Sequence, residues 1–380
     1  MQLTHFLTVF LLPSLAFSAP SKVPQLPRPT GPHKYIGTHS DTLIDTSRLE
    51  TLGGPPNTHR KVVVQGFYPI SKPDSKSTPV HYAPPLTLSL LETEYQIPPG
   101  TLSPLLTNSY FQSTPKPAGQ HLTPLLFSTG MGMPRCLYTT FYEQLASEGY
   151  FVVAIDHPYD AAIVEFPGGE FKPVYSSIPN TTEANFESVV EKYLSVRVAD
   201  AKFVASQLKL LPASYLDLSR LGMFGHSLGG AASAGAMVSP SPIKAGINLD
   251  GTIFLYNKTS VTDYGRKFLL MGTGVHNSTG DETTWGAFEK AQKGWIREIA
   301  MQGFTHGTYT DIGSVVLALG LDKVLDMKDL QGEIGTVKID RARELITTYV
   351  KSFFEFALDG QKEGLMGGPN KKYPEAVFIK

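Results

Sequence analysis

Cysteine is nearly absent from this sequence, since Cys136 is the only one in 380 residues. An intramolecular disulfide is therefore impossible, and the fold must depend on a hydrophobic core, which a domain of this size can bury. An excess of charge of one sign is lacking as well, because 33 Lys and Arg residues stand against 34 Asp and Glu. The composition gives no indication of a nucleic-acid partner or of an attraction to anionic membranes. We expect binding to depend on shape and apolar surface.

Metal and nucleotide motifs are also missing. The sequence holds no H-E-x-x-H pattern or His/Cys cluster for a metal, and no G-x-G-x-x-G or Walker sequence for a nucleotide. No metal and no cofactor is therefore predicted. Beyond the N-terminus, no run reaches the roughly 18 apolar residues of a membrane span. We expect a soluble, monomeric mature protein that contacts lipid surfaces at most transiently.

The N-terminus predicts secretion. A short apolar run over residues 6–12 is followed by Pro13 and by small residues, the pattern of a signal peptide covering residues 1–18 with cleavage after Ser18. Three N-glycosylation sequons are consistent with an extracellular, eukaryotic protein. Their acceptors are Asn180, Asn257 and Asn277.

The rest of the chain predicts one catalytic domain of the α/β class. Residues 19–60 are rich in Pro, Gly, Thr and Ser and are expected to form an extension laid over the domain or partly disordered. Within residues 61–380, short apolar runs alternate with helical patterns, which predicts a mostly parallel sheet with helices on both faces. A Pro- and Gly-rich insertion at about 157–185 is of the kind that covers an active site.

The individual elements follow from the local patterns. Strands are predicted at 61–68, around 86–91, and at 125–128, 151–156, 221–224, 245–250 and 267–272. Helices are predicted at 137–148, 186–211, 284–301 and 341–358.

The most informative motif is G-x-S-x-G at residues 225–229. It follows an apolar run and precedes a small-residue helix, which is the strand–turn–helix context of a nucleophile elbow. Ser227 is therefore the predicted nucleophile. The Leu228 amide, at the start of the helix, is predicted to form half of an oxyanion hole. The second donor is expected in the Gly-rich loop after strand 125–128, and we assign it to the Met131 amide.

The acid and the base of such a triad come after the serine in the chain. Asp250 closes a predicted strand 23 residues after Ser227 and is our candidate acid, with Asp263, Asp281 and Asp311 as alternatives in segments that resemble solvated loops. Two histidines lie further downstream. His276 adjoins a sequon, where a glycan would obstruct a catalytic cleft, so the predicted base is His306. Asp250 would orient the His306 imidazole.

These residues, in order and spacing, resemble the secreted type of platelet-activating-factor acetylhydrolase, an α/β-hydrolase family. The matching segments are 128–132, 137–138, 145–157, Arg197 with Asp200, 225–230, Asp250 and 304–306. The resemblance covers roughly residues 60–358 and implies calcium-independent hydrolysis of short sn-2 acyl esters of phospholipids, with Ser227, Asp250 and His306 as triad and the Met131 and Leu228 amides as oxyanion hole. The signal, sequons and Pro-rich extension look like those of a filamentous-fungal secreted protein.

The leading hypothesis is thus a secreted serine esterase acting on a small-molecule or lipid ester through an acyl-enzyme. Residues 157–185 are expected to contribute substrate contacts. One alternative is a cutinase-like polyester esterase or a secondary-metabolite carboxylesterase with the same triad. Another is a hydrolase-like binding protein without catalysis, because folds are reused for recognition.

Overall fold

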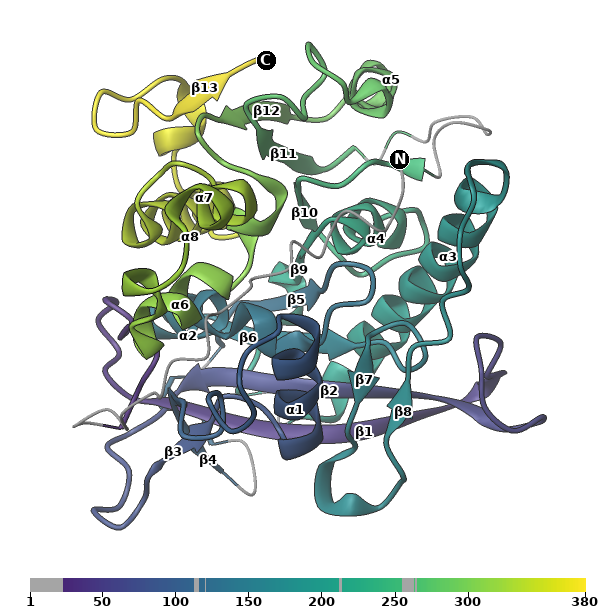
Figure 1. Ribbon diagram of the computed structural model, residues 1–380. Helices are drawn as coiled ribbons and strands as arrows, with labels where there is room; N and C mark the ends of the chain where they lie inside the picture. Colours follow the sequence, from purple (N-terminus) through teal and green to yellow (C-terminus); the bar gives the residue numbers. More distant parts are fainter. Residues whose placement is uncertain (1–22, 113–115, 120, 212–213, 255–262, 264) are drawn as a thin grey trace.

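The computed structural model describes residues 23–112, 116–119, 121–211, 214–254, 263 and 265–380 (Figure 1). Its centre is an 11-stranded sheet with the order β13-β12-β11-β10-β9-β5-β6-β2-β1-β4-β3. The strands are β1 (Ile36–Leu49), β2 (His59–Pro69), β3 (Pro79–His81), β4 (Leu106–Phe111), β5 (Pro124–Ser128), β6 (Phe151–Asp156), β9 (Gly222–His226), β10 (Ala245–Leu249), β11 (Lys267–Thr273), β12 (Ile296–Met301) and β13 (Ala376–Phe378).

The middle of the sheet is parallel. Strands β6, β5, β9, β10, β11 and β12 pair in parallel with their neighbours, whereas β2 and β13 add antiparallel strands to the two sides of this block. The carboxyl ends of parallel strands lie at one edge, so the residues that follow β5, β9 and β10 meet there. In such sheets ligands bind at this edge.

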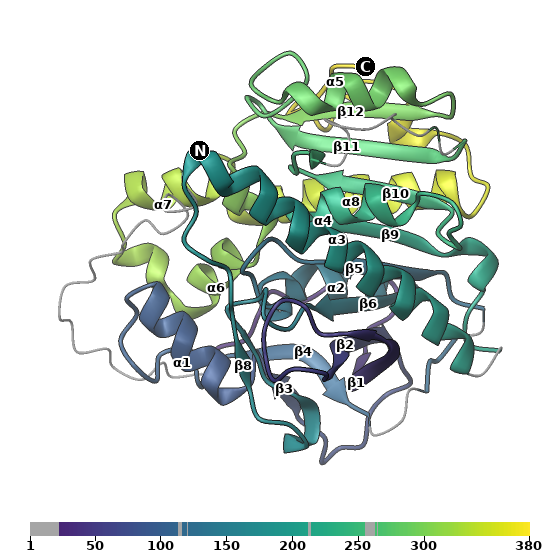
Figure 2. The same ribbon diagram turned by 90° about the vertical axis from the view of Figure 1, so that its right-hand side faces the viewer.

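Helices cover both faces of the sheet, as Figures 1 and 2 show. On one face, α3, α4 and α5 pack against side chains from β6, β9 and β11, and on the other α2 and α8 do so. The helices are α1 (Pro85–Glu94), α2 (Thr139–Ser147), α3 (Glu183–Gln207), α4 (Leu228–Ala236), α5 (Thr283–Ala291), α6 (Ile312–Leu319), α7 (Met327–Ile334) and α8 (Ile339–Ala357). Among the described residues, no helix is long and apolar enough to cross a membrane.

The strand sequences explain why both faces are covered. In β6, Val152 and Ala154 point to the α2/α8 side, while Val153 and Ile155 point to the α3/α4 side, as the two-residue period of a strand requires. Every residue of β6 is buried. A strand that is apolar on both faces is stable only between two layers of helices.

Two predicted elements are wrong. Residues 86–91 belong to helix α1, not to a strand, because Pro85 occupies the first turn of a helix, where its missing N–H costs nothing. The helix predicted at 284–301 is two elements, since α5 ends at Ala291 and residues 296–301 form β12, paired with β11. Gly294 lies between them, where a Cβ would meet the Arg266 backbone at 2.8 Å.

The expected N-terminal extension also needs correction. Residues 36–49 form β1, which pairs with β2 over most of its length, so the sheet begins well before residue 60. The predicted signal peptide lies outside the described residues. The insertion at 157–185 contains a small hairpin, β7 (Ile163–Val164) with β8 (Val174–Tyr175), and α3 starts at its end.

A buried ion network ties β2 to α3. The Arg60 guanidinium, 1% exposed, pairs with Asp200 of α3 at 2.7 Å and with Glu50 at 2.7 Å. Arg48 and His157 also bond Asp200. Burial opposes ionisation of Asp200, but Arg60 and His157 outweigh it and hold the pKa of this carboxyl well below its usual range. The carboxylate is therefore charged and fully partnered at neutral pH.

We expect Asp200→Asn to lower the free energy of unfolding by about 3–5 kcal/mol, because it leaves buried cations without their counter-charge. Urea denaturation measures the change. Asp340→Asn is the control, since Asp340 pairs with Arg343 at the surface at 3.5 Å and should cost under about 1 kcal/mol. Equal costs for the two variants would contradict the role given to this network.

Candidate active site

Ser227 lies on the turn between β9 and α4 in a strained backbone conformation. Its φ is 56° and its ψ −125°, a region that residues with a Cβ rarely occupy. The Ser227 amide donates to the Leu249 carbonyl at 2.8 Å, which ties the turn to the end of β10. This is the geometry expected of a nucleophile elbow.

The glycines of the motif allow the turn to approach its neighbours. A Cβ on Gly225 would lie 2.3 Å from the Gly229 carbonyl oxygen, and one on Gly229 would lie 2.0 Å from the Ser128 carbonyl oxygen. The start of α4 therefore packs directly on the end of β5. Only glycine permits such backbone contact.

Asp250 and His306 are hydrogen-bonded to each other. The Asp250 Oδ2 lies 2.6 Å from the His306 Nδ1, and its Oδ1 accepts from the Thr273 amide at 2.9 Å. Burial opposes ionisation of Asp250, but the bonds from His276 and His306 keep the pKa of this carboxyl well below its usual range. An ionised carboxylate only accepts, so the His306 Nδ1 carries a proton. The other nitrogen, Nε2, is then the one suited to proton exchange with substrate.

All three predicted triad residues border one cavity of about 600 Å³ at the carboxyl edge of the sheet. Ser227 directly follows β9, Asp250 directly follows β10 and His306 lies a few residues after β12. The structure thus brings together residues that lie up to 79 positions apart, from 227 to 306. The alternative acids behave differently: Asp311 is buried and bonded to Thr140, and Asp263 accepts backbone bonds at the surface, whereas Asp281 borders the cavity but is exposed.

The predicted oxyanion donors also border this cavity. Leu228 is the first residue of α4, and the first amides of a helix have no partner within it. Met131 lies in the loop after β5, at the cavity wall. Both residues therefore lie at the same cavity as Ser227.

Arg197, whose role the sequence analysis did not predict, holds the loop that carries Met131. Its guanidinium is fully buried and donates to the carbonyl oxygens of Thr129 and Gly130 and to Asp160, which in turn accepts from the Gly132 amide at 3.2 Å. The loop is thereby held in place at the cavity wall.

A second Ser–His–Asp chain lies beneath this loop. Ser128 Oγ is 3.0 Å from His157 Nε2, and His157 Nδ1 is 2.8 Å from Asp200. All three side chains are inaccessible to solvent and none borders the cavity. Burial and the nearby Arg197 charge lower the pKa of His157, which keeps it neutral. This chain supports the fold and cannot meet a substrate.

His276 lies beside the candidate acid, which the sequence analysis did not predict. Its Nδ1 lies 3.0 Å from Asp250 Oδ1 and its Nε2 lies 2.9 Å from Glu282 Oε2, so the ring joins two carboxylates beside the cavity. Burial alone would lower the pKa of His276, but the bonds to Asp250 and Glu282 raise it to about 10. His276 is therefore a cation next to the candidate acid. Its position downstream of Ser227 was the available signal.

The sequons differ in their surroundings. Asn180 is exposed, whereas Asn257 lies outside the described residues. Asn277 is 3% exposed, and its amide nitrogen donates to the Gly274 carbonyl at 3.0 Å. A glycan on Asn277 conflicts with this environment, because the attached nitrogen faces the interior. An expected glycan at Asn277 is therefore no longer a reason to exclude His276 from the cleft.

The rest of the cavity wall is mainly apolar. Met131, Met133, Phe186 and Phe254 contribute to it, and the insertion contributes residues from both of its arms, among them Ile178. The insertion is therefore placed to touch a bound substrate. Among the described residues, no group of three or more His, Cys, Asp and Glu side chains is placed to hold a metal ion.

Comparisons with known proteins agree in pointing to ester hydrolases. A family model described as platelet-activating factor acetylhydrolase, isoform II, matches residues 100–170. A probable 1-alkyl-2-acetylglycerophosphocholine esterase of Arthroderma benhamiae is 33% identical over 96% of each chain. A platelet-activating factor acetylhydrolase of Cavia porcellus is 24% identical over 52% of this chain and 50% of its own.

Among solved structures, a ferulic acid esterase of Streptomyces cinnamoneus superposes with a TM-score of 0.77. It is 28% identical, and the alignment covers 94% of this chain and all of that one. The predicted α/β-hydrolase architecture is confirmed by this match and by the sheet described above.

We expect Gly229→Ala to lower both stability and activity. The added Cβ must displace the Ser128 backbone and hence the loop of Met131, which should cost about 1–3 kcal/mol of stability and on the order of 100-fold in kcat. Gly286→Ala is the matched control, because nothing lies within 4 Å of its Cβ position in α5. That change should leave activity unaltered. Wild-type kcat in Gly229→Ala would show that the close approach is unnecessary.

His276→Gln should destabilise the protein in a pH-dependent way. The folded-state pKa of His276, about 10, exceeds its unfolded value near 6.5, so its contribution is fully present below pH 6.5 and is lost as pH rises towards 10. Asp250 and Glu282 face His276, and both are ionised in the folded and in the unfolded protein only above about pH 5. Urea denaturation at pH 5.5 should give a difference on the order of 2–4 kcal/mol that shrinks by pH 9.5.

The control for this experiment is His59→Gln, at an exposed position of β2. Its effect on stability should be small, because the side chain is exposed. A pH-independent loss in His276→Gln would mean that His276 acts by packing and not by charge.

Proposed function

Because this chain belongs to the platelet-activating factor acetylhydrolase family and is a carboxylic ester hydrolase, we propose that it cleaves short sn-2 acyl groups of phospholipids with Ser227 as nucleophile. The observation that carries the assignment of roles is the 2.6 Å bond between Asp250 and His306 at the cavity that Ser227 borders. The 33% identical relative, a probable 1-alkyl-2-acetylglycerophosphocholine esterase, supports the substrate class.

The proposed reaction has two halves. Ser227 Oγ attacks the ester carbonyl carbon while His306 Nε2 takes the hydroxyl proton, and the Leu228 and Met131 amides hold the resulting oxyanion. Collapse expels the alcohol, which receives the proton from His306. Water then attacks the acyl-enzyme with His306 again as base, releasing the carboxylic acid and restoring Ser227. Asp250 stabilises the imidazolium at both stages.

The location of the protein is part of the same proposal. The apolar run at 6–12 followed by small residues supports export, and Asn180 is exposed at the end of the insertion, accessible to a glycosyltransferase. We assign the secreted form a single N-glycan at Asn180 among the sequons that the structure describes.

An aryl ester is the second candidate substrate. A ferulic acid esterase of Streptomyces cinnamoneus superposes on 94% of this chain. Two of the aromatic side chains at the cavity, Phe186 and Phe254, have ring centroids 6.1 Å apart and could contact an aromatic acyl group. Such an enzyme would use the same three residues.

The test is hydrolysis of p-nitrophenyl acetate, an sn-2 acetyl phospholipid and methyl ferulate, all with EDTA present. Ser227→Ala should reduce kcat on the preferred substrate by roughly 10³–10⁶-fold, and Asp250→Asn by about 10⁴-fold, because the imidazole loses its orienting acceptor. Preference for the acetyl phospholipid supports the family substrate, and preference for methyl ferulate supports the alternative. Full activity in Ser227→Ala would overturn the assignment of the nucleophile.

A further inference from the structure

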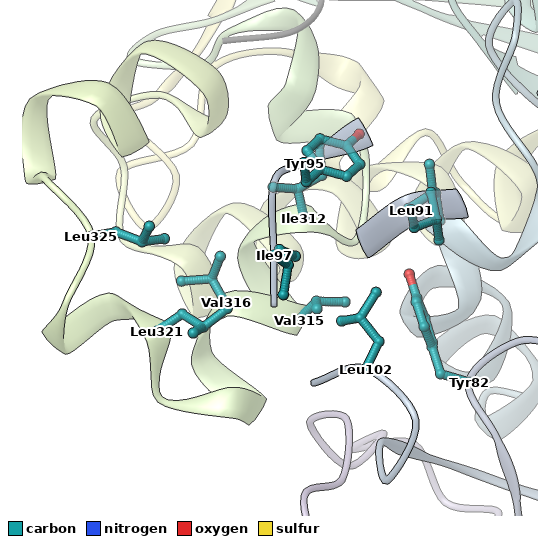
Figure 3. Close-up of a pocket in the computed structure, with 11 residues that line it drawn as sticks. Tyr82, Leu91, Tyr95, Ile97, Leu102, Ile312, Val315, Val316, Leu321 and Leu325 are labelled. Atoms are coloured by element: carbon teal, nitrogen blue, oxygen red, sulfur yellow. The ribbon is translucent and has the colours of Figure 1, made fainter. Parts of the chain in front are cut away.

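A second cavity lies beside the active-site cavity, between α1 and α6 (Figure 3). Eleven residues line it, and all are aliphatic or tyrosine, with no charged side chain among them. Most come from α1, from the segment that follows it, from α6 and from the turn after α6, and Tyr82 and Leu137 complete the wall. Its volume is about 50 Å³. An apolar space of this kind is poorly suited to water, which needs polar partners.

The two cavities share part of their walls. Tyr95 and Leu137 border both of them. Leu137 follows closely after the loop that carries Met131, and Tyr95 ends α1. A chain that leaves the Ser227 region towards the second cavity would pass these two side chains. The shared wall favours the substrate, and not a separate partner, as the occupant of the second cavity.

The rim of the cavity is partly open. Tyr95, Ile97 and Leu325 are half-buried, whereas Leu102 and Val316 in its interior are 2% and 5% exposed. Figure 3 shows these side chains arranged around a common space. A flexible apolar group can therefore enter past the rim and displace no hydrogen-bonded residue.

An acidic side chain where the two cavities adjoin limits which chemical groups can bind there. Glu94, next to Tyr95, borders the active-site cavity, and burial raises the pKa of its carboxyl. A carboxylate or a phosphate would find no favourable interaction with this acid or with the apolar wall beyond it. A hydrocarbon chain has no such conflict, and each methylene that it buries contributes to binding.

We propose that the cavity between α1 and α6 binds the end of a hydrocarbon chain of the ester substrate. The inference rests on the proposed function, since it needs an ester held at Ser227. Each methylene placed in the cavity should raise kcat/KM roughly fourfold until the space is filled. The enzyme is thereby able to prefer esters with a longer chain on one side of the scissile bond.

The experiment measures kcat/KM for two ester series with wild-type enzyme and with Val316→Phe. One series, p-nitrophenyl esters from acetate to palmitate, varies the acyl chain, and the other, alkyl acetates, varies the alcohol. In the series whose chain enters the cavity, wild type should gain with length. Val316→Phe should lower kcat/KM on the longer esters at least tenfold while p-nitrophenyl acetate stays within about twofold, because filling the space excludes the methylenes that would otherwise enter it.

Two further variants separate this effect from damage to the fold. Ile97→Trp obstructs the half-buried rim without enlarging a fully buried side chain, and should reproduce the loss on long esters. Val377→Phe on β13, 39% exposed and bordering neither cavity, is the control for the added ring and should behave as wild type.

The outcomes distinguish this inference from the proposed function. No gain with chain length in either series, or an unchanged ratio of long to short esters in the folded Val316→Phe and Ile97→Trp variants, would overturn the cavity assignment alone. Activity that persists in Ser227→Ala would overturn the proposed function instead. Loss confined to one series identifies which side of the ester carries the chain.

Discussion

The geometry of the candidate active site depends on one buried guanidinium. Arg197 uses all five of its donors: two on Asp160, one each on the Thr129 and Gly130 carbonyls, and one on Ser128 Oγ at 3.3 Å. The planar fork can satisfy these acceptors together, which an ammonium could not. It thereby joins α3, the end of β5 and the start of the insertion. The loop of Met131 keeps its shape because its carbonyls are held from inside the protein.

The charge of the buried Asp250 carboxylate is also stabilised by its hydrogen-bond donors. The carboxylate is 3% exposed, yet it stays charged because two histidines and the Thr273 amide donate to it. His276 is held between Asp250 and Glu282 as a cation, and His306 borders the cavity. One carboxylate thus supports a fixed charge and a nitrogen suited to proton exchange.

Much of the candidate site could be predicted from local sequence, and some of the fold could not. Ser227, Asp250 and His306 were found because a nucleophile turn, a strand end and a late histidine each have local signals, and the structure places all three at one cavity. Residues 86–91 and 296–301 were misassigned because short apolar runs fit a helix or a strand equally well. Strand β1 was missed because its half-exposed residues show little alternation, and pairing with β2 and β4 decides its conformation.

The sequence by itself determined the type of fold, the strained turn at Ser227 and the order of the acid and the base, because each depends on neighbours close in the chain. Only the tertiary structure decided the partners of Arg197, the pairing of His276 with Asp250 and Glu282, and the burial of Asn277. The same is true of the apolar cavity between α1 and α6, whose walls come from residues 82–137 and 312–325. Hydrogen bonds and cavities of this kind join residues far apart in sequence, so no local pattern encodes them.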